Sequence, residues 1–261
     1  MKRHEFLREV HRLARPRNYL EIGVNDGKSL ALSRVPSIAI DPAFKVTVPI
    51  RCDVQLAKAT SDDFFAAPDP LRHLTGGRNP WRNLRRGRPL FDRWRGGTTL
   101  DLAFIDGMHL FEYALRDFMN VERSSRWSTV IVFDDMLPRN VDEAARDRHT
   151  GDWAGDVYKM IPVLREHRPD LVVIPVDTTP TGVLVVLGAD PANTVLRERY
   201  DDIITRWVVP DPQDVPGDIL ERRATVDPER LLAADIWRDI ARHGRMGGPE
   251  AIRDRLSGIL P

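Results

Sequence analysis

The chain has 261 residues, which suffice for one large α/β domain with a full hydrophobic core, or for such a domain with a small appendage. Its 39 Lys and Arg residues balance 39 Asp and Glu residues, so no global electric field attracts nucleic acid or an anionic membrane. Cys52 is the single cysteine, which excludes an intramolecular disulfide and a thiolate zinc site.

The N-terminal segment predicts an amphipathic helix and not a signal peptide. Phe6, Val10 and Leu13 recur at helical spacing between charged residues, and Pro16 ends the helix. The longest apolar runs, such as residues 183–187, have the length of a strand and fall far short of the roughly 20 residues that span a bilayer. We therefore expect a soluble, cytoplasmic protein.

A strand, a glycine turn, a helical segment and a second strand follow the first helix. The strands are predicted at residues 19–23 and 37–40, the helical segment lies at 28–33, and the second strand ends on Asp41. This order is typical of the opening βαβ unit of a nucleotide-binding fold. In such folds glycines let the backbone approach the ligand, and the acid binds ribose hydroxyls.

The turn has the spacing Glu21-x-Gly23-x-x-x-Gly27. It lacks the Gly-x-Gly-x-x-Gly triplet that cradles a pyrophosphate, and Glu21 and Asp26 are poor neighbours for a phosphate. An NAD-dependent oxidoreductase is therefore disfavoured. The turn either approaches a ligand that has no phosphate there or serves tight packing only.

Residues 68–97 differ in composition from the rest of the chain. Pro, Gly and Trp alternate there with arginines and no sustained period, which predicts an inserted loop or lid over the site. The arginines are Arg72, Arg78, Arg82, Arg85, Arg86, Arg88, Arg93 and Arg95. An alternative from a different class of protein is an RNA-binding surface that uses charge and stacking, but the net charge of zero makes nucleic acid an unlikely partner.

The remaining segments alternate between strands and helices, which predicts a mostly parallel sheet with helices on both faces. Strands are expected at 54–61, 100–105, 129–133, 171–174 and 182–187, the last two forming a hairpin, and helices at 110–121, 156–166 and 196–208, with Asp62 and Asp63 capping a further helix after the strand at 54–61. A polar turn spans 139–155. We expect a main domain at 1–208 and a helical extension at 209–261 that packs on the core or on a second subunit.

Acidic residues end two of the predicted strands. Asp106 follows the strand at 100–105, and Asp134 and Asp135 follow the strand at 129–133. The carboxyl ends of strands are where an open α/β sheet keeps its active site, and three carboxylates there form a reasonable cage for Mg²⁺. His109 lies beside the first acid and is the candidate base, with His149 second.

Each of these residues also has a purely structural interpretation. Asp106 could cap the following helix, Asp134 and Asp135 could be turn residues, and His109 could be a hydrogen-bonded core histidine. Their joint arrival at adjacent strand ends favours function. Aromatic side chains that could stack on an apolar ligand face, such as the CH face of a ring, are Trp81, Trp94, Trp153 and Tyr158.

Five segments taken together resemble a group of metal-dependent S-adenosylmethionine (SAM) O-methyltransferases. They are residues 19–27, 104–113, Asp117, 131–135 and 155–159. The group includes the macrocin and mycinamicin sugar methyltransferases and the cephalosporin-hydroxylase-like proteins. The resemblance covers roughly residues 19 to 190. The pairing of Ile-Asp-Gly-x-His with a later Phe-Asp-Asp is its most specific part.

The resemblance implies a Rossmann-like class I methyltransferase fold with a reversed last hairpin. It implies Mg²⁺ or Mn²⁺ on Asp106, Asp134 and Asp135, with His109 and Asp106 as catalytic residues. The residues that it places at the cofactor are Glu21, Gly23, Asn25, Gly27, Asp41, Thr60, Ser61 and Asp106.

The expected reaction is transfer of a methyl group from SAM to a sugar hydroxyl, in an oligosaccharide or polysaccharide precursor or a glycosylated natural product. A catechol or another phenol is the alternative acceptor, because vicinal oxygens also chelate Mg²⁺. A homodimer is expected. The C-terminal extension and the arginine-rich segment lie outside the resemblance.

Overall fold

The computed structural model describes residues 1–75, 98–243 and 247–260 and contains, within them, a seven-stranded sheet of order β3-β2-β1-β4-β5-β7-β6. The strands are β1 Tyr19–Ile22, β2 Ser37–Ile40, β3 Val54–Ala57, β4 Leu102–Ile105, β5 Val130–Phe133, β6 Val172–Val176 and β7 Val183–Leu187. Strands β1 to β5 pair in parallel, whereas β7 runs antiparallel to both β5 and β6. The predicted Rossmann-like methyltransferase fold, including its reversed hairpin, is confirmed.

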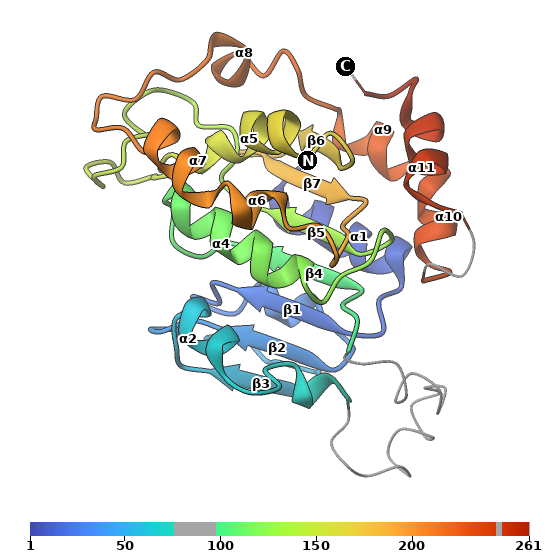
Figure 1. Cartoon of the computed structure of the whole chain (residues 1–261). Coiled ribbons are helices and arrows are strands. Elements are labelled where there is room, and N and C mark those ends of the chain that lie inside the picture. The colour runs from blue at the N-terminus through green and yellow to red at the C-terminus, as the bar shows by residue number, and fades with distance from the viewer. Residues whose placement is uncertain (76–97, 244–246, 261) are drawn as a thin grey trace.

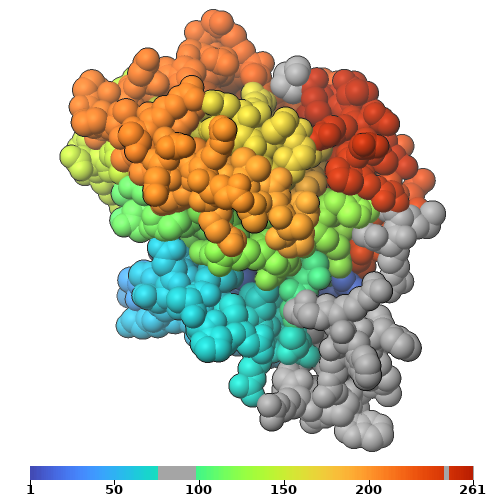
Figure 2. All heavy atoms as spheres, viewed as in Figure 1, coloured from blue at the N-terminus to red at the C-terminus, as the bar shows by residue number. Residues whose placement is uncertain are grey.

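Helices cover both faces of the sheet because its central strands are apolar on both sides (Figure 1). One face packs against α2 Ser61–Ala66, α4 Phe111–Glu122, α5 Met160–His167, α6 Val195–Glu198 and α7 Tyr200–Trp207. The other face packs against α1 Arg3–Ala14, α9 Pro228–Leu232, α10 Ile236–Ile240 and α11 Pro249–Leu256. Figure 2 shows the chain from α6 to α8 Gly217–Leu220, in orange, spread over the upper part of the face in view.

The parallel strands end level with one another. Ile22 pairs with Ile40 and Ile105, Ile40 pairs with Ala57, and Ile105 pairs with Phe133. The residues that follow these strands therefore begin at one edge of the sheet, although more than 100 positions separate the first from the last.

Several predicted helices are shorter than expected. The segment 28–33 forms only the 3₁₀ turn η1 Leu30–Leu32, and residues 157–159 form the 3₁₀ turn η4 Val157–Lys159 before α5 begins. The helix expected at 196–208 is divided at Arg199 into α6 and α7. Strand β3 ends at Ala57, and Thr60, not Asp62 or Asp63, caps α2 by accepting a hydrogen bond from the Asp63 N–H group.

The C-terminal extension consists of four short helices in the part that is described, and each of them contributes a buried side chain to the core. Leu231, Ile236, Trp237 and Ile240 join the apolar cluster that also contains α1 side chains.

The division into two domains and the homodimer stay predictions. Apart from the 3₁₀ turn η2 Arg72–Thr75, the expected lid lies mostly outside the described residues. No helix in the described ranges is long and apolar enough to cross a membrane.

Gly23 is required where β1 meets β4. Its φ angle is +86°, and a Cβ atom there would lie 1.7 Å from the backbone oxygen of Asp106. We expect Gly23→Ala to lower the free energy of unfolding by roughly 1–3 kcal/mol or more, because both the backbone conformation and the contact oppose a side chain. Chemical denaturation measures this loss.

Gly217→Ala is the matched control, since nothing lies within 4 Å of a Cβ atom built at Gly217. It should change the free energy of unfolding by less than about 0.5 kcal/mol. Equal stability of the two variants would contradict the close approach at Gly23.

Candidate functional site

The glycine turn after β1 is closed by the acid that follows β2. Asp41 Oδ2 accepts hydrogen bonds from the backbone N–H groups of Val24 at 2.9 Å and Asn25 at 2.8 Å. Gly23 and Gly27 have positive φ angles of +86° and +82°, and Asn25 shares this left-handed conformation. The turn and Asp41 therefore form one unit at the edge of the sheet, and their role in binding a nucleoside stays a prediction.

Glu21 lies beneath this turn and is completely buried. Its Oε2 atom accepts a hydrogen bond from the Tyr19 hydroxyl at 2.6 Å, and its Oε1 atom accepts one from Ser29 at 2.7 Å. Burial raises the pKa of Glu21 to about 8, although both hydrogen bonds oppose the rise. The carboxyl group thus supports the turn from within the core, and its two oxygens already have partners there.

The residues expected near adenine lie at the start of α2. Thr60 caps this helix, and the Ser61 hydroxyl donates a hydrogen bond to Asp117 on α4. Asp117 is buried, and burial raises its pKa to about 7. This contact joins α2 to α4 on the same face of the sheet. Asp117 is part of the sequence resemblance, which gives it no role.

Three of the predicted side chains gather at the ends of β4 and β5. Asp106, His109 and Asp135 each offer a ligand atom, and these atoms lie within 4.8 Å of one another. His109 Nε2 is 3.4 Å from Asp106 Oδ1 and 3.4 Å from Asp135 Oδ2. All three residues are partly exposed. Two carboxylates and an imidazole are a donor set that fits a divalent cation.

Asp134 lies outside this cluster. Its side chain is only 2% exposed and forms an ion pair with Arg3 at the start of α1. The same guanidinium nitrogen, Nη1, is 3.3 Å from Asp106 Oδ2. Sequence reasoning did not include Arg3, because a charged residue on an amphipathic helix about 100 positions away carries no signal of this contact.

The loop before η4 fixes the orientation of His109. Its Nδ1 atom lies 2.8 Å from the backbone oxygen of Trp153, and the two rings stack with centroids 5.1 Å apart. Because a carbonyl can only accept, Nδ1 carries the proton and Nε2 faces the carboxylates. Gly155 closes the contact, since a Cβ atom there would lie 1.7 Å from the backbone oxygen of His109.

The carboxylates around His109 also control its charge. Burial lowers its pKa, but the hydrogen bond with Asp106 and the negative charges of Asp135 and Asp106 outweigh this effect and raise the pKa to about 9. The negative charge of this corner thus favours a bound cation or proton.

The second candidate base and the aromatic side chains predicted from the sequence occupy different places. His149 is 53% exposed, and its contacts in the described part of the chain are with Asp142 and Asp147. Tyr158 is buried in the core, so it is not available to stack on a sugar. Trp153 is half-buried beside His109, and Trp81 and Trp94 lie outside the described residues.

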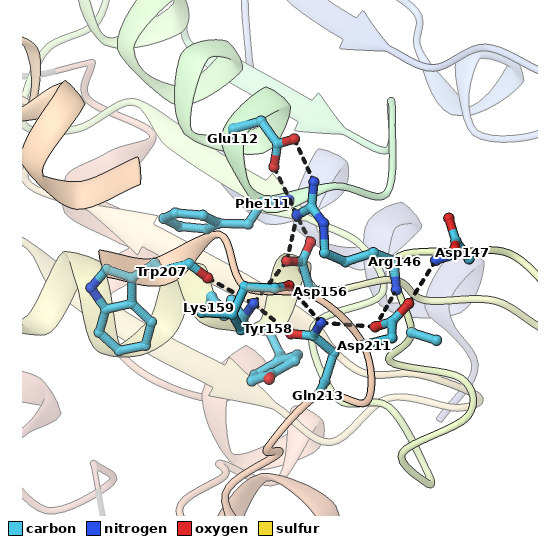
Figure 3. A network of polar contacts seen from close by, with 12 residues as sticks. Phe111, Glu112, Arg146, Asp147, Asp156, Tyr158, Lys159, Trp207, Asp211 and Gln213 are labelled. Carbon is cyan, nitrogen blue, oxygen red and sulfur yellow. Dashed lines mark hydrogen bonds and ion pairs between the residues drawn. The ribbon is translucent and has the colours of Figure 1, made fainter. Parts of the chain in front are cut away.

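A buried polar network anchors the loop that holds His109 (Figure 3). Asp156 accepts hydrogen bonds from the Phe111 N–H group at 2.8 Å, from Arg146 at 2.7 Å and from Lys159 at 2.9 Å. Lys159 Nζ also donates to the Trp207 carbonyl at 2.8 Å and to Gln213 Oε1 at 2.6 Å, and so uses its three donors.

No protein-family model matches the chain, and no curated protein matches it in sequence. Some solved structures are similar. An O-methyltransferase from Bacillus cereus in complex with S-adenosylhomocysteine (SAH) is 16% identical, with a TM-score of 0.39 over 70% of this chain and 79% of that one. TomG from Streptomyces achromogenes, an O-methyltransferase involved in tomaymycin synthesis and in complex with SAM, is 17% identical, with a TM-score of 0.38 over 70% and 78%. SAH-bound PaMTH1, a methyltransferase of Podospora anserina, is 13% identical, with a TM-score of 0.41 over 70% and 76%. These values define neither a reaction nor a substrate.

Glu21 should make stability depend on pH. Its pKa is about 8 in the folded chain against an ordinary value of 4.5, so between these values the folded state holds a proton that the unfolded state has released. The contribution of this group is therefore complete below pH 4.5 and is lost as the pH rises towards 8. Glu21→Gln removes this dependence. As the pH rises from 4.5 to 8, the free energy of unfolding of Glu21→Gln minus that of the unmodified chain should increase by up to about 1 kcal/mol per pH unit.

Denaturant unfolding at pH 5, 6.5 and 8 measures the difference between the two proteins. Glu229→Gln, at an exposed position on α9, is the control and should give a nearly constant difference. A constant difference for Glu21→Gln as well would mean that Glu21 is ionised in the folded chain.

Asp156 should be essential for the buried network. Asp156→Asn leaves Arg146 and Lys159 with one anion fewer in a buried place, and we expect a loss of about 3–5 kcal/mol in the free energy of unfolding. Glu166→Gln is the control. It breaks the exposed pair with Arg206, which has a distance of 2.6 Å, and should cost less than about 1 kcal/mol. Thermal unfolding of both variants tests this prediction, and equal midpoint temperatures of unfolding would contradict it.

Proposed function

We propose that the chain is an O-methyltransferase that uses SAM and a divalent cation, Mg²⁺ or Mn²⁺, and transfers the methyl group to a sugar hydroxyl. The observation that supports this most is the meeting of Asp106, His109 and Asp135 within 4.8 Å, beside the turn that contains Gly23. A nucleoside site and a cation site would then share one edge of the sheet.

The residues for the cofactor are those of the turn and its neighbours. Asp41, Gly23 and Asn25 would hold the ribose and the amino acid part, and Thr60 and Ser61 at the start of α2 would border the adenine. Because Asp41 already accepts two backbone hydrogen bonds, its carboxylate is held in place before a ligand arrives. When bound, SAM supplies an electrophilic methyl group on a positively charged sulfur.

Methyl transfer is an in-line displacement, which requires the acceptor oxygen, the methyl carbon and the sulfur to be collinear, with oxygen and carbon about 3 Å apart. Asp106 and Asp135 would hold the cation, which on binding would lower the pKa of an acceptor hydroxyl and offset the carboxylate charges that raise the pKa of His109. His109 Nε2 would accept the hydroxyl proton while the oxygen–carbon bond forms and the carbon–sulfur bond breaks, leaving neutral SAH.

Two features favour a sugar as the acceptor. A sugar hydroxyl is barely acidic, so it needs both the cation and a base, and the cluster offers both. Trp153 lies half-buried against His109 and could stack on the CH face of a pyranose. A catechol could bind the same cation and base. Methylation assays with both saccharides and catechols distinguish the two acceptor classes.

Calorimetric titration with SAH, in the presence of Mg²⁺ or of EDTA, tests the proposal. We expect micromolar binding by the unmodified chain, and methylation of a saccharide panel that stops without the cation and in Asp106→Ala. Asp201→Ala, at an exposed position on α7, is the control and should behave as the unmodified chain.

Failure to bind SAH would contradict the proposal as a whole. Methylation of catechols without saccharides would replace the acceptor class. Turnover that persists in EDTA would refute the role of the cation.

A further inference from the structure

Arg3, at the start of α1, brings a positive charge to the acids that follow β4 and β5, where the proposed function places a cation. This place, formed by Asp106, Asp134 and Asp135, is called the acidic corner below. Arg3 Nη1 lies 3.3 Å from Asp106 Oδ2 and forms an ion pair with Asp134. We propose that Arg3 and a divalent cation are alternative occupants of this corner, so that Arg3 limits the cation affinity of the site. The inference rests on the cation dependence of the proposed function.

The Asp134 carboxylate requires a positive partner. Its side chain is 2% exposed. Among the described residues, no group donates a hydrogen bond to its buried Oδ2 atom, which leaves the ion pair with Arg3 as its polar contact. An ionised carboxylate in such a place is costly unless a cation faces it. Arg3 supplies that charge, and a divalent ion could supply it equally well.

Asp106 connects the two positions. Its Oδ1 atom faces His109 Nε2 at 3.4 Å, and its Oδ2 atom faces Arg3 at 3.3 Å. A cation that binds both Asp106 and Asp134 would occupy the space of Arg3 Nη1. A cation held by Asp106 and Asp135 would share one carboxylate with the guanidinium and would be repelled by it. In both arrangements the two positive groups compete.

Arg3 can leave without the unfolding of α1. The helix is anchored by the buried side chains of Phe6, Leu7 and Val10, whereas Arg3 is 28% exposed. The chain before it is held by hydrogen bonds with the turn between β6 and β7. The Arg3 N–H group donates to the Thr179 carbonyl at 3.2 Å. The Thr179 N–H group donates to the Met1 carbonyl at 3.0 Å.

The same turn contacts a candidate cation ligand. The Thr181 hydroxyl, two positions after Thr179, donates a hydrogen bond to Asp135 Oδ1. A cation on Asp135 therefore changes the surroundings of the turn that holds residues 1–3. Cation binding and release of the N-terminal residues should be coupled.

Titration with Mn²⁺, followed by the electron paramagnetic resonance signal of the free ion, tests the inference in the presence of SAH. We expect Arg3→Gln to bind Mn²⁺ roughly tenfold more tightly than the unmodified chain, because a competing charge is removed. Arg8→Gln makes the same change at an exposed position of α1 and should bind as the unmodified chain does. Asp106→Asn should weaken binding in either background.

Equal or weaker Mn²⁺ binding by Arg3→Gln would overturn the inference and leave the proposed function intact. Absence of Mn²⁺ binding by all variants would overturn both the inference and the cation dependence, whereas SAH binding would still be measured separately.

Hydrogen exchange on the unmodified chain gives a second readout that needs no variant. Mg²⁺ should speed exchange of the Arg3 and Thr179 amides, whose hydrogen bonds hold the N-terminal residues on the turn. Unchanged or slower exchange, under conditions where Mg²⁺ binding is measured, would overturn the inference.

Discussion

The level ending of the parallel strands is the constraint on which the rest of the structure depends. One hydrogen bond beyond each strand continues the ladder: the N–H groups of Gly23, Asp41, Asp106 and Asp134 donate to the last carbonyl of a neighbouring strand. Side chains that follow different strands therefore start from the same edge. The turn and the acidic cluster depend on this register, because a one-residue slip would turn every side chain of the strand to the opposite face of the sheet.

The negative charges of the acids at this edge are stabilised in three different ways. Backbone N–H groups satisfy Asp41, which fixes the glycine turn, and Arg3 balances the buried Asp134. Asp106 and Asp135 share one imidazole and remain partly exposed. The Asp41 arrangement is closed, while Asp106 and Asp135 keep carboxylate oxygens with capacity for a further ligand, and this is why the proposed chemistry centres there.

The position of His109 depends on residues far from the chemistry. Residues 139–155 contain no helix or strand, and long irregular loops of this kind hold a fixed shape only where they are anchored. Asp156 and Lys159 tie the end of the loop to α4 and to the end of α7, and the Trp153 carbonyl then orients the histidine ring. Stability of the network and geometry of the site are therefore linked.

The sequence by itself determined the alternation of strands and helices, the final hairpin and the acids that follow β2, β4 and β5, because apolar runs, glycine turns and strand-end acids are local signals. It overestimated helix length after Gly27 and in the C-terminal extension, where packing and turns override propensity. Only the tertiary structure decided that Glu21 faces the core, that Asp134 pairs with Arg3 and that His109 joins Asp106 and Asp135. The physical reason is that these arrangements depend on the direction of each side chain and on contacts between different segments of the chain, which no local pattern records.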